Sequence, residues 1–558
     1  MVKNTKLNDF LNLGIVLAIL IFINVLGGIY FYRIDLTEEK RYTISEAGKK
    51  ILAALPNDVV VEVYLEGEFP AGFKRLQKAI KEKLDDMKSQ SKGRLFYRFI
   101  DPSAQNDSKK RTEFYFSLVK KGIQPTNLYA NESGNKTEKL IFPGAVIRMA
   151  NAETSVMLLK GNQMAAPDEI LNQSIEGIEY EILNGIKSIS SAERKKVAYL
   201  RGNNETDSVY IADLVSSLNQ QYEVRPVNLK RAANLAGYDA IIVGKPTVAF
   251  DEEDKLKIDQ FIIDGGKALF FIDPMNINLD SLKSIGAVPI PYNLGLEELF
   301  FSYGARINND LVQDIQCAYI PVNVGTMGNQ PQIKMMPWRY FPIVNNFGSH
   351  TIVKNLDALY FRFASSIDTV KSTGIKKTVL ASTSKYSQKF GGMRQVSFNE
   401  IRIEPKPEDF NQSFIPLAVL LEGKFKSPFA DRLLFQQKYP GIKLQNKESK
   451  VLIVADGDFF RNEMNPKNGQ AMPMGFDPFM KKKFANKDFI MNALTFMVDD
   501  VGLINSRLKE ITLRPLDKYR IERDKTQIQL YNIVLPLVII ILFGFGKYWL
   551  RKRQFGKN

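Results

Sequence analysis

The sequence predicts an α/β protein held to a membrane, with two soluble α/β domains and a β-rich insertion between one transmembrane helix at each end. Two observations lead to this prediction. An uncharged apolar run stands near each terminus, and the long region between them alternates strand-type and helix-type patterns. Several strand-type segments are apolar almost throughout, which is typical of parallel strands covered by helices on both faces.

The two apolar runs have the length of membrane-spanning helices. The first extends from Leu11 to Tyr32 and the second from Leu530 to Leu550; the first contains no charge, and the second contains none before Lys547. An α-helix needs about 20 residues to cross a hydrocarbon layer about 30 Å thick. We therefore predict a membrane-anchoring helix at each run, and a cleaved signal peptide is the alternative for the first.

Positive charges next to the second run predict the orientation of the chain. The C-terminal tail holds five basic residues and no acidic one: Lys547, Arg551, Lys552, Arg553 and Lys557. Positively charged flanks stay in the cytoplasm. We expect a two-pass protein of the inner membrane, with residues 1–10 and 551–558 cytoplasmic and the region between the helices in the periplasm.

Composition excludes several classes of function. The net charge is +15, but the basic residues form short clusters that do not alternate with aromatics, so no nucleic-acid surface is predicted. A single cysteine, Cys317, excludes an internal disulfide, and a single histidine, His350, excludes any site that needs two.

The first soluble domain is predicted over 37–192. Its pattern gives strands at 59–67, 94–102, 126–130, 138–149 and 154–160, and helices at 45–55, 73–88, 113–121 and 170–190. Ser45 is the expected N-cap of the first of these helices. The β-α-β order predicts an α/β domain, and a thioredoxin-like order of elements is compatible with it.

The second soluble domain is predicted in two pieces, 193–300 and 446–504, separated by a β-rich region at 301–445. Strands at 195–202, 222–229, 239–244 and 265–274 alternate with helices at 208–218 and 251–264, and a late strand at 450–460 precedes a helix at 486–498. Right-handed crossovers predict a doubly wound, flavodoxin- or amidotransferase-like layer that the late strand joins. A charged linker, 505–529, leads back to the membrane.

Motifs for catalysis are weak. The chain has no GxxxxGK[ST] and no GxSxG, so we predict no catalytic residue and no cofactor. We interpret Cys317 as a packing thiol and His350 as a surface imidazole, with a Cys–His dyad as the alternative. Asp456 and Asp458 end a predicted strand; we interpret them as a turn, with a divalent-cation site as the alternative.

Several stretches, in order, resemble one family. They are RIDLTEEKRYTISEAGKKIL after the first run, KVAYLRGNNE, DEEDKLKIDQFIIDGGKALFFIDP, VLIVADGDFFRNE, and NKDFIMNALTFMVDDVGLINSRLKEITLRPL near the end. With an apolar run at each terminus, they resemble the GldG family of gliding-motility ABC-transporter auxiliary proteins. The resemblance implies a multi-span permease-like subunit and a cytoplasmic ATPase as partners. It also implies a binding domain of a type shared with intraflagellar-transport proteins.

Three hypotheses of function follow. The leading one is a non-enzymatic periplasmic subunit of an ABC-type complex that supports gliding and is linked to protein secretion. The second is a membrane-tethered hydrolase or amidotransferase-like enzyme that acts on envelope material. The third is a cell-wall-binding scaffold that uses the excess of basic residues.

Overall fold

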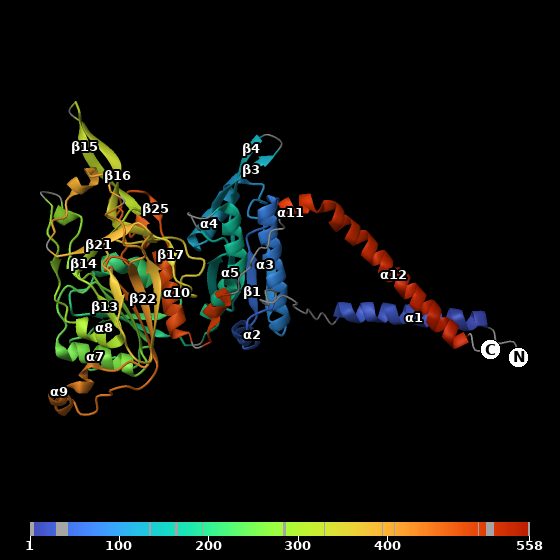
Figure 1. Ribbon diagram of the computed structural model, residues 1–558, viewed down its shortest axis with the longest axis horizontal. Coiled ribbons are helices and arrows are strands. Elements are labelled where there is room, and N and C mark those ends of the chain that lie inside the picture. Colours follow the sequence, from blue (N-terminus) through green and yellow to red (C-terminus); the bar gives the residue numbers. More distant parts are fainter. Residues whose placement is uncertain are drawn as a thin grey trace. The chain divides into compact units, whose positions relative to one another are not determined.

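The computed structural model describes residues 5–29, 43–132, 135–161, 166–191, 193–282, 286–328, 330–392, 394–406, 408–499, 501–508 and 518–555 (Figure 1). Tyr32 and part of the predicted linker lie outside these residues. The chain forms two compact units, Met1–Lys509 and Glu510–Asn558. The predicted α/β class is confirmed. Both predicted soluble domains fall in the first unit, so their boundaries stay a prediction.

The first sheet of the large unit has four strands in the order β2-β1-β5-β6. Its strands are β1 Val59–Val63, β2 Leu95–Phe99, β5 Gly144–Met149 and β6 Ala152–Met157. The helices of this region are α2 Glu46–Ala53, α3 Ala71–Gln90, α4 Ser108–Lys120 and α5 Pro167–Ser190. β1 pairs with β2 in parallel and with β5 antiparallel, and β5 pairs with β6 antiparallel.

Local sequence explains the helices around this sheet. The Ser45 hydroxyl accepts a hydrogen bond from the backbone N–H of Gly48, so the predicted N-cap of α2 is confirmed. The stripe of apolar residues along α3 is fully buried against the sheet. An amphipathic helix of this kind gains its stability from such packing more than from intrinsic propensity.

The strand predicted at 138–149 is wrong as a single element. It forms two strands, β4 Asn135–Ile141 and β5, and β4 pairs with β3 Thr126–Glu132 in a separate hairpin. Pro143 lies between them and has no N–H to donate to a ladder. The chain therefore leaves the hairpin and enters the sheet at this point.

The second sheet has eight strands in the order β17-β20-β22-β23-β10-β9-β7-β8. Its parallel strands are β7 Lys196–Arg201, β8 Glu223–Asn228, β9 Ala240–Gly244, β10 Lys267–Phe271 and β23 Ser449–Val454. Antiparallel strands extend one side: β17 Asn346–Phe347, β20 Ile375–Ser382 and β22 Pro416–Gly423. The order reverses between β7 and β9, as in a flavodoxin-like layer. The late strand, β23, joins this sheet as expected.

Helices cover both faces of the large sheet. One face packs against α6 Ala212–Leu218 and α10 Asn486–Val498. The other packs against α7 Glu252–Ile263 and α8 Glu297–Tyr303. The side chain of Asp251 caps α7 by accepting a hydrogen bond from the backbone N–H of Asp254.

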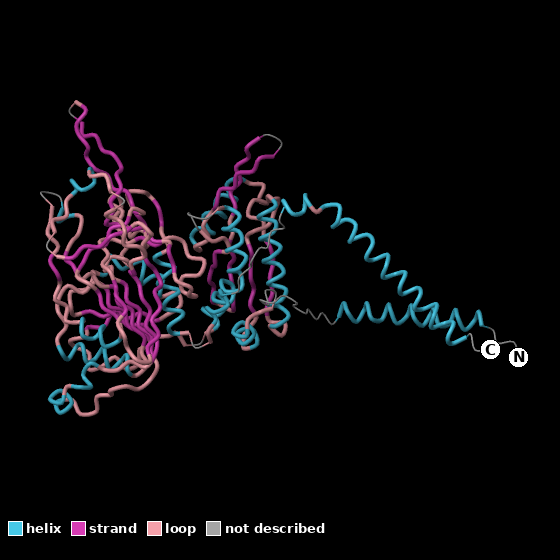
Figure 2. Tube along the Cα trace, viewed as in Figure 1, coloured by secondary structure: helices cyan, strands magenta, loops and turns pink. Residues whose placement is uncertain are grey.

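Short antiparallel pairs and one long hairpin occupy most of the region predicted to be β-rich, 301–445, and one such pair, β11 with β12, already lies before it, within the predicted segment 193–300. The short strands are β11 Met275–Asn276, β12 Ile290–Pro291, β13 Ala305–Ile307, β14 Asp310–Asp314, β18 Leu359–Tyr360, β19 Ile367–Thr369 and β21 Ser387–Gly391. The hairpin consists of β15 Cys317–Met327 and β16 Gln330–Val344, and it projects from its surroundings (Figure 2). A short helix, α9 Leu433–Lys438, and the pair β24 Phe476–Asp477 and β25 Lys482–Lys483 follow.

The second unit contains α11 Lys518–Arg523 and α12 Lys525–Phe555. The segment Lys525–Arg553 is the one helix among the described residues that is long and apolar enough to cross a membrane. At the other terminus, α1 spans Thr5–Ile29. Its apolar stretch, Leu13–Asn24, is shorter than a membrane-spanning helix. The two-pass topology therefore stays a prediction.

Candidate binding site at the carboxyl edge of the large sheet

The carboxyl ends of three neighbouring parallel strands bring charged residues together. Lys245 follows β9 directly, Asp273 follows β10 by two residues, and Asp456 follows β23 by two residues. Because parallel strands end at the same edge, residues far apart in the chain meet there. Ligands of open α/β sheets bind at this edge, so this edge is the candidate binding site.

Lys245 lies between two carboxylates. Its Nζ is 3.0 Å from Oδ2 of Asp273 and 2.7 Å from Oδ2 of Asp458, and all three side chains are largely buried. Burial alone would lower the pKa of Lys245, but the two carboxylates raise it above the ordinary value. Lys245 is therefore a protonated counter-ion and is not suited to act as a base.

The carboxylates of the cluster are held by the backbone. Asp456 accepts hydrogen bonds from the N–H groups of Asp458 and Arg362, both at 2.7 Å. Burial, followed by repulsion from Asp273 and Asp458, raises the pKa of Asp456 well above its usual value. Burial also opposes ionisation of Asp458, but Lys245 and the nearby arginines hold the pKa of Asp458 below its usual value.

Arg362 connects the edge to the β-rich region. Its N–H binds Asp456, its guanidinium pairs with Glu463, and its Cζ lies 5.0 Å from the ring centre of Tyr360. A guanidinium that pairs and stacks in this way is strongly oriented. Through this residue, the insertion between β10 and β23 takes part in the same charged network.

Gly457 lets the strand ends approach one another. A Cβ atom at this position would lie 2.8 Å from Cγ of Lys245 and 2.9 Å from Cγ of Asp273. The Gly457 N–H also donates to Oδ1 of Asp273. Glycine is therefore required here by close packing of the backbone against the ion pair.

The loop after β7 covers the point where the strand order reverses. Glu205 is buried and accepts hydrogen bonds from the N–H groups of Gly202, at 2.9 Å, and Asn203, at 3.0 Å. The amide of Asn203 donates to the carbonyl of Ala249, at 2.9 Å, which ties this loop to the one after β9. Burial raises the pKa of Glu205. Hydrogen bonds from its own polar groups thus hold this loop at the point where the strand order reverses.

A cleft of about 390 Å³ opens beside the end of β10. Its walls are mainly apolar, and its polar groups come from Glu297, Arg306, Asn308 and Asn309. Arg306 is itself paired with Asp368, at 2.6 Å. An apolar cleft with a few polar groups is suited to binding a small ligand or a peptide side chain.

Cys317 and His350, the two residues of the alternative Cys–His dyad, lie in environments that do not activate them. Cys317 is buried at the start of β15, and burial raises the pKa of its thiol to about 12. His350 packs edge-on against Phe496, and burial lowers its pKa. A thiol with such a pKa is not a thiolate at neutral pH, so neither residue has the properties of an activated dyad.

The weak metal candidates, Asp456 and Asp458, lie together in the charged cluster. Asp458 faces the ammonium group of Lys245, and a lysine between carboxylates takes the position that a cation would need. Among the described residues, no group of three or more His, Cys, Asp or Glu side chains is arranged to hold a metal ion. The pairing of Lys245 with both Asp273 and Asp458 matches a structural ion network.

Part of this cluster could have been found from the sequence. Asp273 and Asp456 end strands of the buried parallel type, and Lys245 follows another, so the rule for parallel strands would bring them together. Arg362 and Glu463 could not have been found in this way. They come from irregular segments whose approach to the sheet has no periodic signal.

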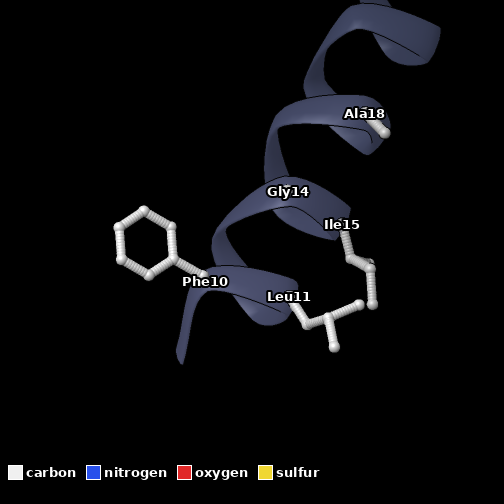
Figure 3. A pocket seen from close by; sticks show the side chains of 5 residues that line it. All are labelled: Phe10, Leu11, Gly14, Ile15 and Ala18. Atoms are coloured by element: carbon white, nitrogen blue, oxygen red, sulfur yellow. The ribbon is translucent and has the colours of Figure 1, made fainter. Parts of the chain in front are cut away.

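Three of the predicted anchor residues, Leu11, Leu530 and Leu550, lie on α1 and α12, whereas Tyr32 lies outside the described residues. Leu530 and Leu550 are exposed on α12, and the topology-setting residues Lys547, Arg551, Lys552 and Arg553 lie in its C-terminal part. On α1, Leu11 lines a shallow hollow of about 420 Å³ with Phe10, Gly14, Ile15 and Ala18. Figure 3 shows Leu11 and Ile15 on one side and Phe10 on the other, with only a hydrogen and a methyl group at Gly14 and Ala18. Small residues four apart allow close helix packing within membranes.

Comparison with known proteins gives one relative over the whole length. A protein of Borreliella burgdorferi strain B31, described as an "uncharacterized protein", is 23% identical over 568 residues, and the match covers 99% of each chain. Two solved structures overlap about half of this chain: the mmIFT52 N-terminal domain, at 14% identity, and a ThuA-like protein from Parabacteroides merdae, at 10%. They cover 54% and 55% of this chain and 96% and 90% of their own chains. Their TM-scores are 0.29 and 0.26, which are too low to support a conclusion.

Family models match most of the large unit. A domain of unknown function matches residues 38–148, which contain β1, β2 and all of β5 except its last residue. The model described as "ABC-type uncharacterized transport system" matches residues 194–493, more than half of the chain. This match runs through the whole eight-stranded sheet, the charged cluster and the β-rich insertion. The chain therefore belongs to the auxiliary-component family of ABC-type transport systems.

Proposed function

We propose that this protein is a non-catalytic accessory subunit of an ABC-type transport complex, anchored in the inner membrane with its large unit in the periplasm. A permease-like subunit and a cytoplasmic ATPase are its partners. The observation that supports the proposal most directly is the family match over 194–493, together with a C-terminal helix of membrane-spanning length. The sequence has no P-loop, so energy from ATP has to come from a partner.

The carboxyl edge of the large sheet supports a binding role for the large unit. The charged residues there are neutralised by one another, and Lys245 is held protonated. The cleft beside them is lined by both apolar and polar side chains. This combination favours recognition of a ligand or partner over chemical conversion.

The ordered sequence stretches shared with the GldG family support a role in gliding motility, linked to protein secretion. The two-pass topology, with both termini cytoplasmic, completes this proposal. It follows from the apolar run at each end and from the basic tail at Lys547, Arg551, Lys552 and Arg553.

Gentle purification of the full chain from its native membrane tests the accessory role. We expect an ATPase and a multi-span subunit to co-purify in constant ratio, as identified by mass spectrometry. An Arg306→Glu variant, altered at the rim of the cleft, should keep both partners if the cleft binds the transported ligand. Repeated recovery of the wild-type chain without either partner would refute the proposed function.

A further inference from the structure

The long hairpin of the β-rich region has an apolar face turned toward solvent. We define the arm as residues 319–337 of β15 and β16 (Figure 2). Cross-strand register places Tyr319 opposite Pro337, Pro321 opposite Met335 and Asn323 opposite Ile333. Directly paired residues point to the same side of a hairpin, and residues two apart share a side. These six residues therefore form one face, which we call the outer face.

The opposite face of the arm covers the protein core. Ile320 is buried in the aromatic cluster around Trp338, and Val322 and Met336 pack against the same cluster. An antiparallel pair with one buried face normally turns polar side chains outward. Here five of the six outer-face residues are apolar, and Tyr319, Ile333 and Met335 are 44%, 66% and 40% exposed. An exposed apolar surface of this kind marks an interaction site.

The surroundings of the outer face are basic. No acidic residue occurs between 315 and 339. Lys334 pairs with Val322 and so lies on the opposite face, whereas Arg339, two residues after Pro337 on β16, shares the side of the outer face. The backbone N–H of Tyr319 donates to Sδ of Met480, at 3.4 Å, and two exposed lysines, Lys481 and Lys482, follow Met480 directly in the chain. A partner that fits here has an apolar centre and negative charge at its rim.

We propose that the outer face of the arm binds a segment of another protein that presents apolar side chains flanked by carboxylates. Met and Tyr are enriched in the centres of protein interfaces, and Met adapts its shape to the partner. A second copy of this chain fits less well, because a two-fold contact would bring both sets of lysines together. A lipid surface also fits less well, because interfacial segments use Trp, Phe and Leu, and the outer face has none.

Site-specific photocrosslinking in native membranes tests this proposal. A benzoyl-phenylalanine at position 333 of the full chain should form a crosslink to a protein segment in which mass spectrometry finds apolar residues flanked by Asp or Glu. Phe116 on α4, which is 70% exposed, is a matched apolar control and should not give this product. A crosslink to lipid, to a second copy or to nothing would overturn the proposal.

Charge exchange makes the test specific. Lys481→Glu with Lys482→Glu should reduce the crosslink yield on the order of 10-fold, because like charges then meet at the rim. Replacing the carboxylates of the mapped segment by lysine should restore the yield. An unchanged yield, or a loss that is not restored, would contradict the proposed charge pairing. If the double variant unfolds, Ile333→Asp in the otherwise unchanged chain serves instead: it should reduce co-purification with the mapped partner, and unchanged co-purification would contradict the proposal.

Discussion

At the scale of single residues, the most demanding feature is a lysine buried between two aspartates. Lys245 pairs with Asp273 and Asp458 at the edge where β9, β10 and β23 end. Taking charges out of water is costly, and the cost is offset only while every partner is present. Each residue of the cluster therefore stabilises the fold only while its charged partners are also present.

Lys245→Met should leave two buried carboxylates without their counter-ion. We expect a loss of about 3–5 kcal/mol in the free energy of unfolding, as found for broken buried ion pairs. Urea denaturation of the detergent-solubilised chain measures it. Lys443→Met is the matched control, because Lys443 pairs with Asp264 at the surface and its loss should cost less than about 1 kcal/mol. Equal effects of the two substitutions would contradict the structural role of the cluster.

Glu205 predicts a pH dependence of stability. Because burial raises its pKa in the folded state, its contribution to stability is greatest at low pH and is lost as the pH rises through that pKa. Glu205→Gln keeps an oxygen for the N–H groups of Gly202 and Asn203 but carries no charge. The free energy of unfolding of the variant, relative to wild type, should therefore increase from about pH 4 to about pH 7. If the difference in free energy of unfolding between Glu205→Gln and wild type stays constant over this pH range, burial does not raise the pKa of Glu205.

Substitution of Cys317 and His350 distinguishes the accessory role from an enzymatic one. The raised pKa of the buried thiol and the packing of the imidazole on Phe496 predict that Cys317→Ala and His350→Ala keep transport or gliding function. Function in cells that carry each variant is the measurement, with protein abundance as the control. Loss of function at wild-type abundance would favour the hydrolase alternative.

Sequence reasoning located residues at strand ends better than residues in irregular segments. Asp456 and Asp458 were found because an apolar strand precedes them, and Asp273 ends a strand for the same reason. Arg362 reaches the cluster only because the β-rich insertion folds back onto the sheet. That return depends on tertiary packing, which has no local pattern.

At the scale of elements, β23 occupies the centre of the large sheet and the arm lies outside it. β23 pairs with β10 on one side and β22 on the other, and both of its faces are covered. The arm pairs only within itself over most of its length. An isoleucine in β23 should therefore contribute much more to stability than an isoleucine in the arm.

Ile453→Ala and Ile333→Ala test this difference. Ile453 is fully buried in β23, so its truncation should cost about 2–5 kcal/mol through lost burial and a new cavity. Ile333 is 66% exposed on the arm, and its truncation should change stability by less than about 0.5 kcal/mol. The shift in the midpoint of urea denaturation measures both. A large effect at Ile333 would mean that the arm supports the fold and is not an interaction surface.

Elements with strong periodicity were predicted well, and those that depend on turns were not. The helix at 486–498 coincides with α10, since apolar residues recur at helical spacing and a strand precedes it. The strand at 138–149 was wrong because its apolar residues continue through Pro143, where the chain changes partners. The arm was not foreseen, because its proline and glycine content suggests loops rather than long strands.

At the scale of the whole molecule, the proposed attachment to the membrane would constrain the large unit. α12 alone has the length and apolarity of a span among the described residues, and the proposed two-pass topology adds α1. A subunit held at one end can rotate freely about its anchor. A subunit held at both ends is constrained near the bilayer, where it can follow the movements of a permease.

Truncation before Lys525 distinguishes the two cases. A chain of residues 1–524 should remain in the membrane fraction after carbonate washing if α1 also anchors it, because an inserted helix resists such extraction. The matched variant, residues 34–558, should remain there through α12. Immunoblotting of pellet and supernatant gives the answer. Release of the 1–524 chain would show that α12 is the sole anchor.

The position of β23 in the chain has a consequence for biosynthesis. Gly266, next to β10, and Ser449, at the start of β23, are in contact although 183 residues separate them. While the ribosome synthesises the intervening segment, the apolar edge of β10 that pairs with β23 in the folded protein stays open. Such an edge invites pairing with the wrong strand. Nonsense mutations in the insertion should therefore yield aggregates rather than soluble fragments, which fractionation of the expressed fragments measures.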